Sequence, residues 1–108
     1  MPFYDLTQVK SKTLATGVQA FPAWGEGIML VRVELAPHSQ VPEHTHTHEQ
    51  AGIVLEGELD FSIGEESRHL RVGDAYLVPS GVPHSATTGD SQALVLDIFN
   101  PPREDYKP

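Results

Sequence analysis

Apolar and polar residues alternate along much of the chain, as they do in half-buried β-strands. From Ile28 to Leu35, the residues Met29, Val31, Val33 and Leu35 share one face and charged residues occupy the other. The same criterion predicts strands over residues 53–55, 58–63, 68–72, 75–78 and 94–99. No window shows the period of a long amphipathic helix. The chain is therefore predicted to be all-β.

Turn residues separate these segments at regular intervals. Glu56-Gly57 is expected to close a hairpin between residues 53–55 and 58–63, and Gly73-Asp74 to turn the chain into the next strand. Such regular spacing favours a barrel or jelly roll. Without a repeat or linker, residues 1–108 are read as one domain. It comprises an N-terminal arm over residues 1–21, a barrel over 22–100 and a C-terminal tail over 101–108.

Composition narrows the classes of function. The chain has no cysteine, which excludes thiolate chemistry and leaves His, Asp, Glu or Gln as side-chain metal ligands. Seven basic and fifteen acidic residues give a net charge of -8, which disfavours nucleic acid as a partner. No apolar run approaches the ~20 residues of a membrane span. We expect a cytoplasmic protein with no membrane partner.

Three histidines, His44, His46 and His48, fall within five residues and suggest a metal site. On an extended strand, His44 and His46 would point the same way, with Gln50 further along that face. A straight strand would add His48, so a bulge must turn it aside, or else His46 and His48 form the pair. His84 is a distant fourth candidate. Imidazole ligands suit a divalent ion such as Zn, Ni, Fe or Mn.

The C-terminal segment offers catalytic candidates. The two-residue period places Asp97 and Phe99 on the face of Val95. If that face lines a cavity, Asp97 suits general acid or base work; otherwise it is a solvated carboxylate. Arg103 suits a substrate carboxylate, although a terminal arginine is often a surface charge.

Two histidines are expected to be solvated surface residues without a role. They are His38 and His69.

Two motifs resemble those of the cupin superfamily. The first runs His-x-His, three residues, an acid or amide, then six residues to a glycine, and is matched by His44, His46, Gln50 and Gly57. The second runs glycine, five residues, Pro-x-Gly, two residues and His, and is matched by Gly73, Pro79, Gly81 and His84. The resemblance implies a double-stranded β-helix, the cupin jelly-roll barrel. It also implies one metal ion, held at the barrel mouth by the two histidines of the first motif, Gln50 and His84.

Two positions depart from the usual cupin pattern. Gln50 replaces a glutamate, so a bound cation would be less neutralised and more electrophilic, which favours Lewis-acid chemistry over dioxygen chemistry. Thr88 replaces an asparagine, and we assign it to strand pairing rather than ligation.

The run Asp97-x-Phe99, three residues, Arg103, then Glu104-Asp105-Tyr106, resembles the C-terminal signature of the pectin-degradation cupins. Those proteins linearise and ketonise 4,5-unsaturated uronate monomers from pectin or alginate. The resemblance implies a sugar-acid substrate and catalytic roles for Asp97, Phe99 and Arg103. Two alternatives stay open: a cupin that binds a sugar acid without converting it, and a metal-dependent dioxygenase.

The N-terminal arm predicts how the molecule assembles. It carries apolar residues too regularly to be a mere tail, namely Phe3, Leu6, Val9, Leu14, Val18 and Phe21. We therefore expect a homodimer, paired across a two-fold axis.

Overall fold

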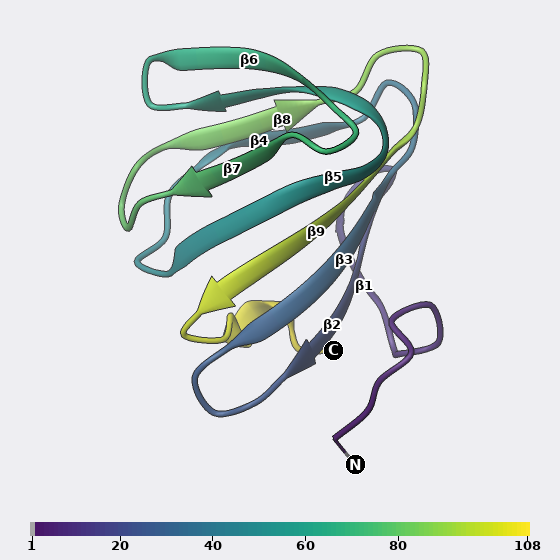
Figure 1. The fold of residues 1–108 in the computed structure, drawn as a ribbon, viewed down its shortest axis with the longest axis vertical. Coiled ribbons are helices and arrows are strands. Elements are labelled where there is room, and N and C mark those ends of the chain that lie inside the picture. Colours follow the sequence, from purple (N-terminus) through teal and green to yellow (C-terminus); the bar gives the residue numbers. More distant parts are fainter. Residues whose placement is uncertain (1) are drawn as a thin grey trace.

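The computed structural model describes residues 2–108 and shows nine β-strands with one short 3-10 turn near the C-terminus (Figure 1). The strands are β1 (Lys12–Ala15), β2 (Val18–Trp24), β3 (Met29–Leu35), β4 (Gln40–His44), β5 (Glu49–Ile63), β6 (Glu66–Arg71), β7 (Ala75–Val78), β8 (His84–Thr87) and β9 (Ala93–Asn100); the turn η1 spans Glu104–Tyr106. The all-β prediction is confirmed. Across these residues, no helix has the length and apolar character needed to cross a membrane.

The long strand β5 joins two groups of strands into one curved, antiparallel sheet. Its first half lies between β9 and β7, and its second half lies between β6 and β8. The neighbour order is β1-β2-β3-β9-β5-β8-β4, with β6 and β7 paired to β5 beside this path. Figure 1 shows β2, β3 and β9 side by side below β5, with β4, β6 and β8 above it. The sheet thereby curls around an interior.

The predicted hairpin at Glu56-Gly57 is wrong, because β5 runs through these residues without reversing. Gly57 has a φ of +73°, a left-handed conformation that glycine adopts without steric cost. It is the last residue of β5 paired to β9, and Glu58 is the first paired to β6. A register shift between Val54 and Glu56 adds a bulge just before it. Gly57 therefore bends one strand from one group to the other.

The alternation read from the sequence matches the buried face of the sheet. Met29 and Val31 of β3 are completely buried, and Leu59 of β5 is 2% exposed. In β9, Asp97 and Phe99 point inward with Val95, as predicted. Figure 1 shows β9 running through the middle of the sheet, so the inward face of this strand forms one wall of the interior.

Both ends of the chain are more structured than an arm and a tail. Residues 12–21, assigned to the arm, form β1 and the first part of β2. In the tail, Pro102 and Arg103 are buried and η1 follows directly. Thr88 is buried, and its hydroxyl donates to the Ala36 carbonyl over 2.6 Å. It ties two connecting segments together, just beyond the ends of β3 and β8.

Candidate metal and substrate site

Three histidines converge from different segments of the chain. His44 ends β4, His46 lies in the connection between β4 and β5, and His84 begins β8. His44 and His84 are register partners in the β4–β8 ladder. Each residue offers one ligand atom, and these atoms lie within 4.8 Å of one another. The prediction that His44 and His46 share one strand is wrong: β4 ends at His44, where it is paired to β8, and β5 begins only at Glu49, where it is paired to β9.

Backbone carbonyls fix which ring nitrogen carries the proton in each of these histidines. Nδ1 lies 2.9 Å from the Pro42 carbonyl in His44 and 2.9 Å from the Val82 carbonyl in His84. Nδ1 of His46 lies 2.9 Å from the His48 carbonyl. A carbonyl can only accept, so each Nδ1 must be the donor. Each Nε2 is then left with a free lone pair, the form of imidazole that binds metals.

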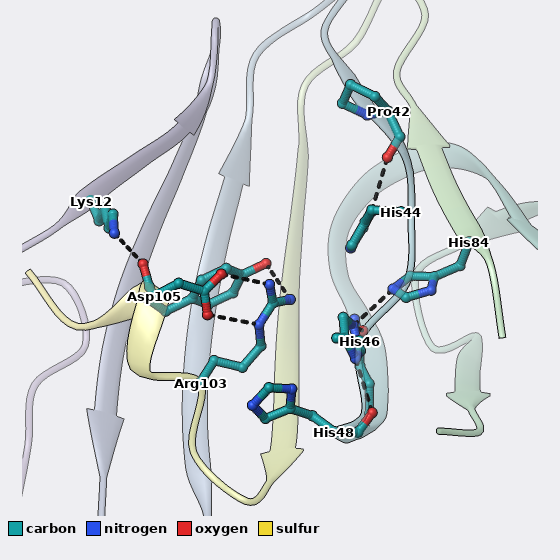
Figure 2. A network of polar contacts seen from close by, with 10 residues as sticks. Lys12, Pro42, His44, His46, His48, His84, Arg103 and Asp105 are labelled. Atoms are coloured by element: carbon teal, nitrogen blue, oxygen red, sulfur yellow. Dashed lines mark hydrogen bonds and ion pairs between the residues drawn. The ribbon is translucent and has the colours of Figure 1, made fainter. Parts of the chain in front are cut away.

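These lone pairs face one another. Nε2 of His46 lies 3.1 Å from Nε2 of His84 and 3.1 Å from Oε1 of Gln50. With both Nδ1 atoms protonated, no hydrogen stands between the two nitrogens, so the contact is repulsive unless a cation lies between them. Figure 2 shows His44, His46 and His84 turned toward one common point. The donor set fits a divalent metal ion, and the three histidines can hold one.

Burial favours the neutral form of two of these imidazoles, those of His46 and His84. It lowers the pKa of His46 to about 4, and the positive charge of Arg103 acts in the same direction. Burial also lowers the pKa of His84. Neutral imidazole is the ligand form, so both shifts favour metal binding near neutral pH.

Gln50 lies between the histidine cluster and the buried carboxylate of Asp97. Burial raises the pKa of Asp97 to about 6, although hydrogen bonds from Tyr76 and Gln50 and the charge of Arg103 oppose the rise. Gln50 is 5% exposed, and its amide nitrogen is the atom able to donate to Asp97. Its amide oxygen is thereby turned toward His46. The structure brings the four predicted ligands and the predicted acid–base residue together.

Arg103 lies in the same site, with its side chain only 9% exposed. Its guanidinium lies 5.2 Å from the Phe99 ring centroid and 4.1 Å from that of Tyr106. Nε and Nη2 donate to the Asp105 carboxylate over 3.2 and 2.8 Å, and Nη1 donates to the Tyr106 hydroxyl over 3.1 Å. A guanidinium has five N–H groups, so one remains on each terminal nitrogen. Phe99 is fully buried, and its ring centroid lies 5.7 Å from that of His46.

The other three histidines are not among the convergent ligand atoms. His48 is turned away from the cluster and toward Arg103 in Figure 2, as a bend would require. His38 is on the surface and lies 3.0 Å from Asp90. His69 does have companions, since its two ring nitrogens lie 2.8 Å from Asp60 and 2.9 Å from Glu58, and these bonds raise its pKa.

Two hollows adjoin the histidine cluster. The inner one, of about 40 Å³, is lined by His44, Gln50, His84 and Asp97 among others and has room for about one water. The outer groove, of about 370 Å³, is lined by Lys12, His44, Arg103 and Tyr106 among others, and this volume suits a small ligand. Lys12 donates to the Asp105 carbonyl at its rim (Figure 2). A larger hollow, of about 530 Å³ between β6 and β7, contains none of the three histidines, so we do not assign it to the metal site.

Sequence reasoning gave no role to two tyrosines of the site. Tyr106 belongs to the C-terminal signature, and its ring covers Arg103. Tyr76 donates to Asp97 over 2.5 Å. Its position in the predicted strand over residues 75–78, on the same face as Val78, was the available signal.

Comparison with known proteins gives a consistent result. The Cupin domain family model matches residues 31–99. The pectin degradation protein KdgF of Dickeya dadantii is 30% identical over 84 residues, which are 77% of this chain and 76% of that protein. The structure of KdgF from Halomonas sp. superposes with a TM-score of 0.88 at 28% identity, covering 97% of each chain. An RmlC-like cupin from Shewanella frigidimarina gives 0.89 at 25% identity, covering 97% of this chain and 95% of that one.

Proposed function

The chain belongs to the cupin family, and we propose that it is a metal-dependent enzyme acting on 4,5-unsaturated uronate monomers from pectin or alginate breakdown. It would convert the ring form to the linear, ketonised form. One observation carries the proposal: Asp97, Phe99 and Arg103 lie beside the convergent histidine cluster, as the resemblance to pectin-degradation cupins implies. Likeness to KdgF along most of the chain supports it.

We assign His44, His46, Gln50 and His84 as the residues that hold one divalent ion, of Zn, Ni, Fe or Mn. The ion would supply Lewis-acid polarisation of the sugar oxygens. A neutral set of three imidazoles and an amide leaves the full charge of the ion for this task. The site would accept an anion although the chain carries a net charge of -8.

Arg103 would hold the substrate carboxylate. Its two remaining N–H groups, one on each terminal nitrogen, are available to donate to the oxygens of a carboxylate. Arg103 and His44 both line the outer groove. Phe99 lies beneath Arg103 and against His46, and so shapes the floor between the anion site and the histidines.

Asp97 would move the proton. Ring opening takes the proton from the anomeric hydroxyl, and ketonisation delivers one to C4 of the enol, so a single carboxylate can accept and return it. The reaction is an isomerisation and needs no external oxidant or reductant. A pKa of about 6 suits such a group, because both protonation states are accessible near neutral pH.

Loss of the substrate's conjugated chromophore tests this function. Metal-loaded protein should accelerate the loss above the spontaneous rate. Asp97→Asn should lower kcat by roughly 10²-fold with the metal retained, because it removes the proton carrier. Asp90→Asn, on an exposed loop, is the matched control and should leave kcat unchanged. Arg103→Ala should chiefly raise KM, since the anion contact serves the ground state and the transition state alike.

Three outcomes would contradict the proposal in different ways. Absence of acceleration by the metal-loaded wild-type protein would leave a sugar-acid-binding cupin as the better interpretation. Full activity of Asp97→Asn would remove the acid–base assignment alone. Oxygen consumption during turnover would point to a dioxygenase.

A further inference from the structure

A tyrosine to which the proposed chemistry gives no task lies against the proposed proton carrier. The Tyr76 hydroxyl donates to Asp97 Oδ1 over 2.5 Å, and both side chains are buried, at 7% and 8% exposure. Tyr76 belongs to β7 and Asp97 to β9, and these strands are not neighbours. They lie on opposite sides of β5. The hydrogen bond must therefore cross an intervening strand.

Gly52 of β5 makes this crossing possible. It is the register partner of Tyr76 on one side and of Asp97 on the other, so the three residues form one row across the inner face. A Cβ at position 52 would lie 2.1 Å from Cζ of Tyr76 and 2.4 Å from its hydroxyl oxygen. Gly52 does not have the positive φ that would by itself favour glycine. The missing side chain is needed for the space that the Tyr76 ring fills.

Phe61 holds the ring in this place. Its ring stacks on that of Tyr76 with centroids 4.2 Å apart and planes 26° apart. The hydroxyl is thereby fixed on Oδ1 of Asp97, while Gln50 contributes a second hydrogen bond to the same carboxylate. A carboxylate bound in this way cannot rotate freely, which is the condition for proton transfer in a defined direction.

We infer that Tyr76 is a positioning residue, which reaches through the gap at Gly52 to orient the Asp97 carboxylate toward the substrate. The inference rests on the proposed function, since Asp97 must carry the proton. Tyr76 itself does not touch the sugar. It acts by holding Oδ1, so that the Asp97 carboxylate keeps one orientation in the site.

The variant Tyr76→Phe tests the inference, because it removes the hydroxyl and keeps the ring that stacks on Phe61. We expect kcat to fall about 10-fold or more, with KM within about 2-fold and metal content unchanged. Tyr4→Phe is the matched control, since Tyr4 is 57% exposed, and its kcat should equal that of the wild type. A wild-type kcat in metal-loaded Tyr76→Phe overturns the inference.

A second measurement does not depend on turnover. In protein labelled with ¹³C at aspartate carboxyls, the Asp97 resonance can be assigned by its loss in Asp97→Asn. We expect Tyr76→Phe to shift this resonance and to leave those of the exposed aspartates in place. If the wild-type protein does not turn over the substrate, the proposed function alone is overturned. The shift of the Asp97 resonance in Tyr76→Phe then still tests whether Tyr76 orients Asp97. An unmoved Asp97 resonance overturns the inference in either case.

Discussion

Gln50 shows how one residue type can serve two neighbours at once. Its amide oxygen faces His46, and its amide group is hydrogen-bonded to Asp97. A glutamate at this position could not donate, and its charge would lie beside the Asp97 carboxylate. Glutamine at position 50, where most cupins have glutamate, is therefore compatible with the neighbouring carboxylate of Asp97. Residue 50 and residue 97 are best understood as a pair.

His84 provides the sharpest single-residue test of the metal site. It is 3% exposed, and its Nε2 faces that of His46. We expect wild-type protein to carry about one divalent ion per chain, and His84→Ala to lower the affinity by at least about 100-fold. Elemental analysis after dialysis measures the content. His38→Ala is the control, since His38 is a surface residue paired with Asp90. A variant that keeps its full metal content would refute the assignment of His84 as a ligand.

Among the elements, β5 determines the architecture because it belongs to both groups of strands. We expect Gly57→Ala to lower the free energy of unfolding by at least about 2 kcal/mol, owing to the positive φ and to a Cβ placed 2.0 Å from the Gln92 carbonyl oxygen. Urea denaturation measures the change. Gly73→Ala is the matched control, because Gly73 has a φ of +92° but no atom within 4 Å of an added Cβ.

The control separates backbone strain from the clash. Gly73→Ala should cost about 1 kcal/mol, the part due to the left-handed backbone. Equal losses of unfolding free energy in the two variants would mean that the contact with Gln92 is absent. The pairing of β5 with β9 would then end at a residue other than Gly57.

The same strand shows how far the sequence could predict the fold. Alternation identified the buried faces of β3 and β9 correctly, because each keeps a strict two-residue period. It failed at Gly57, since a glycine after a charged residue is as compatible with a bend inside a strand as with a hairpin. It also left β1 within an arm, because a four-residue edge strand has too few positions for a clear pattern.

The candidate site was predictable to a different extent. The histidine spacing and the motifs identified the residues that converge, from His44 to Arg103. The Tyr76–Asp97 contact was not predictable, because it depends on two registers that share Gly52. Pairing across three strands is long-range information, and local spacing does not contain it.

At the scale of the whole molecule, the outer face of the sheet carries apolar residues that bear on how the protein assembles. In β9, Leu94, Leu96 and Ile98 point away from the interior, so this strand is apolar on both faces. Some neighbouring outward positions are apolar as well; they are Leu30 of β3, Ala51 and Ile53 of β5 and Leu77 of β7. The outward neighbours of Leu94 are charged, since its register partners are Glu34 of β3 and Glu56 of β5. An antiparallel sheet with one free face normally shows polar residues there. An exposed apolar patch of this kind predicts a partner that covers it.

We propose that a second copy of the chain covers this face, which relocates the expected dimer contact from the N-terminal arm to the sheet. Two copies of a chain with a net charge of -8 repel each other, so they should meet where charge is scarce. At the border of the face, Arg32 lies 2.5 Å from Glu34. In a dimer with a two-fold axis, Arg32 of each copy could pair with Glu34 of the other copy. Ile53 lies in the row between Leu96 and Ala75 and is 37% exposed.

Light scattering should therefore give a dimer mass for the wild type and a monomer mass for Ile53→Glu, because a buried, unpaired carboxylate would face its symmetry mate. Folding of the monomer should change little, since Ile53 is already partly exposed. Val72→Glu adds the same charge at a residue that is 62% exposed, in the turn between β6 and β7, and should stay dimeric. A wild-type monomer at working concentration would contradict the dimer itself. If Ile53→Glu remains a dimer, the interface lies elsewhere. The N-terminal arm, where Phe3 is 84% exposed, is then the next contact to test.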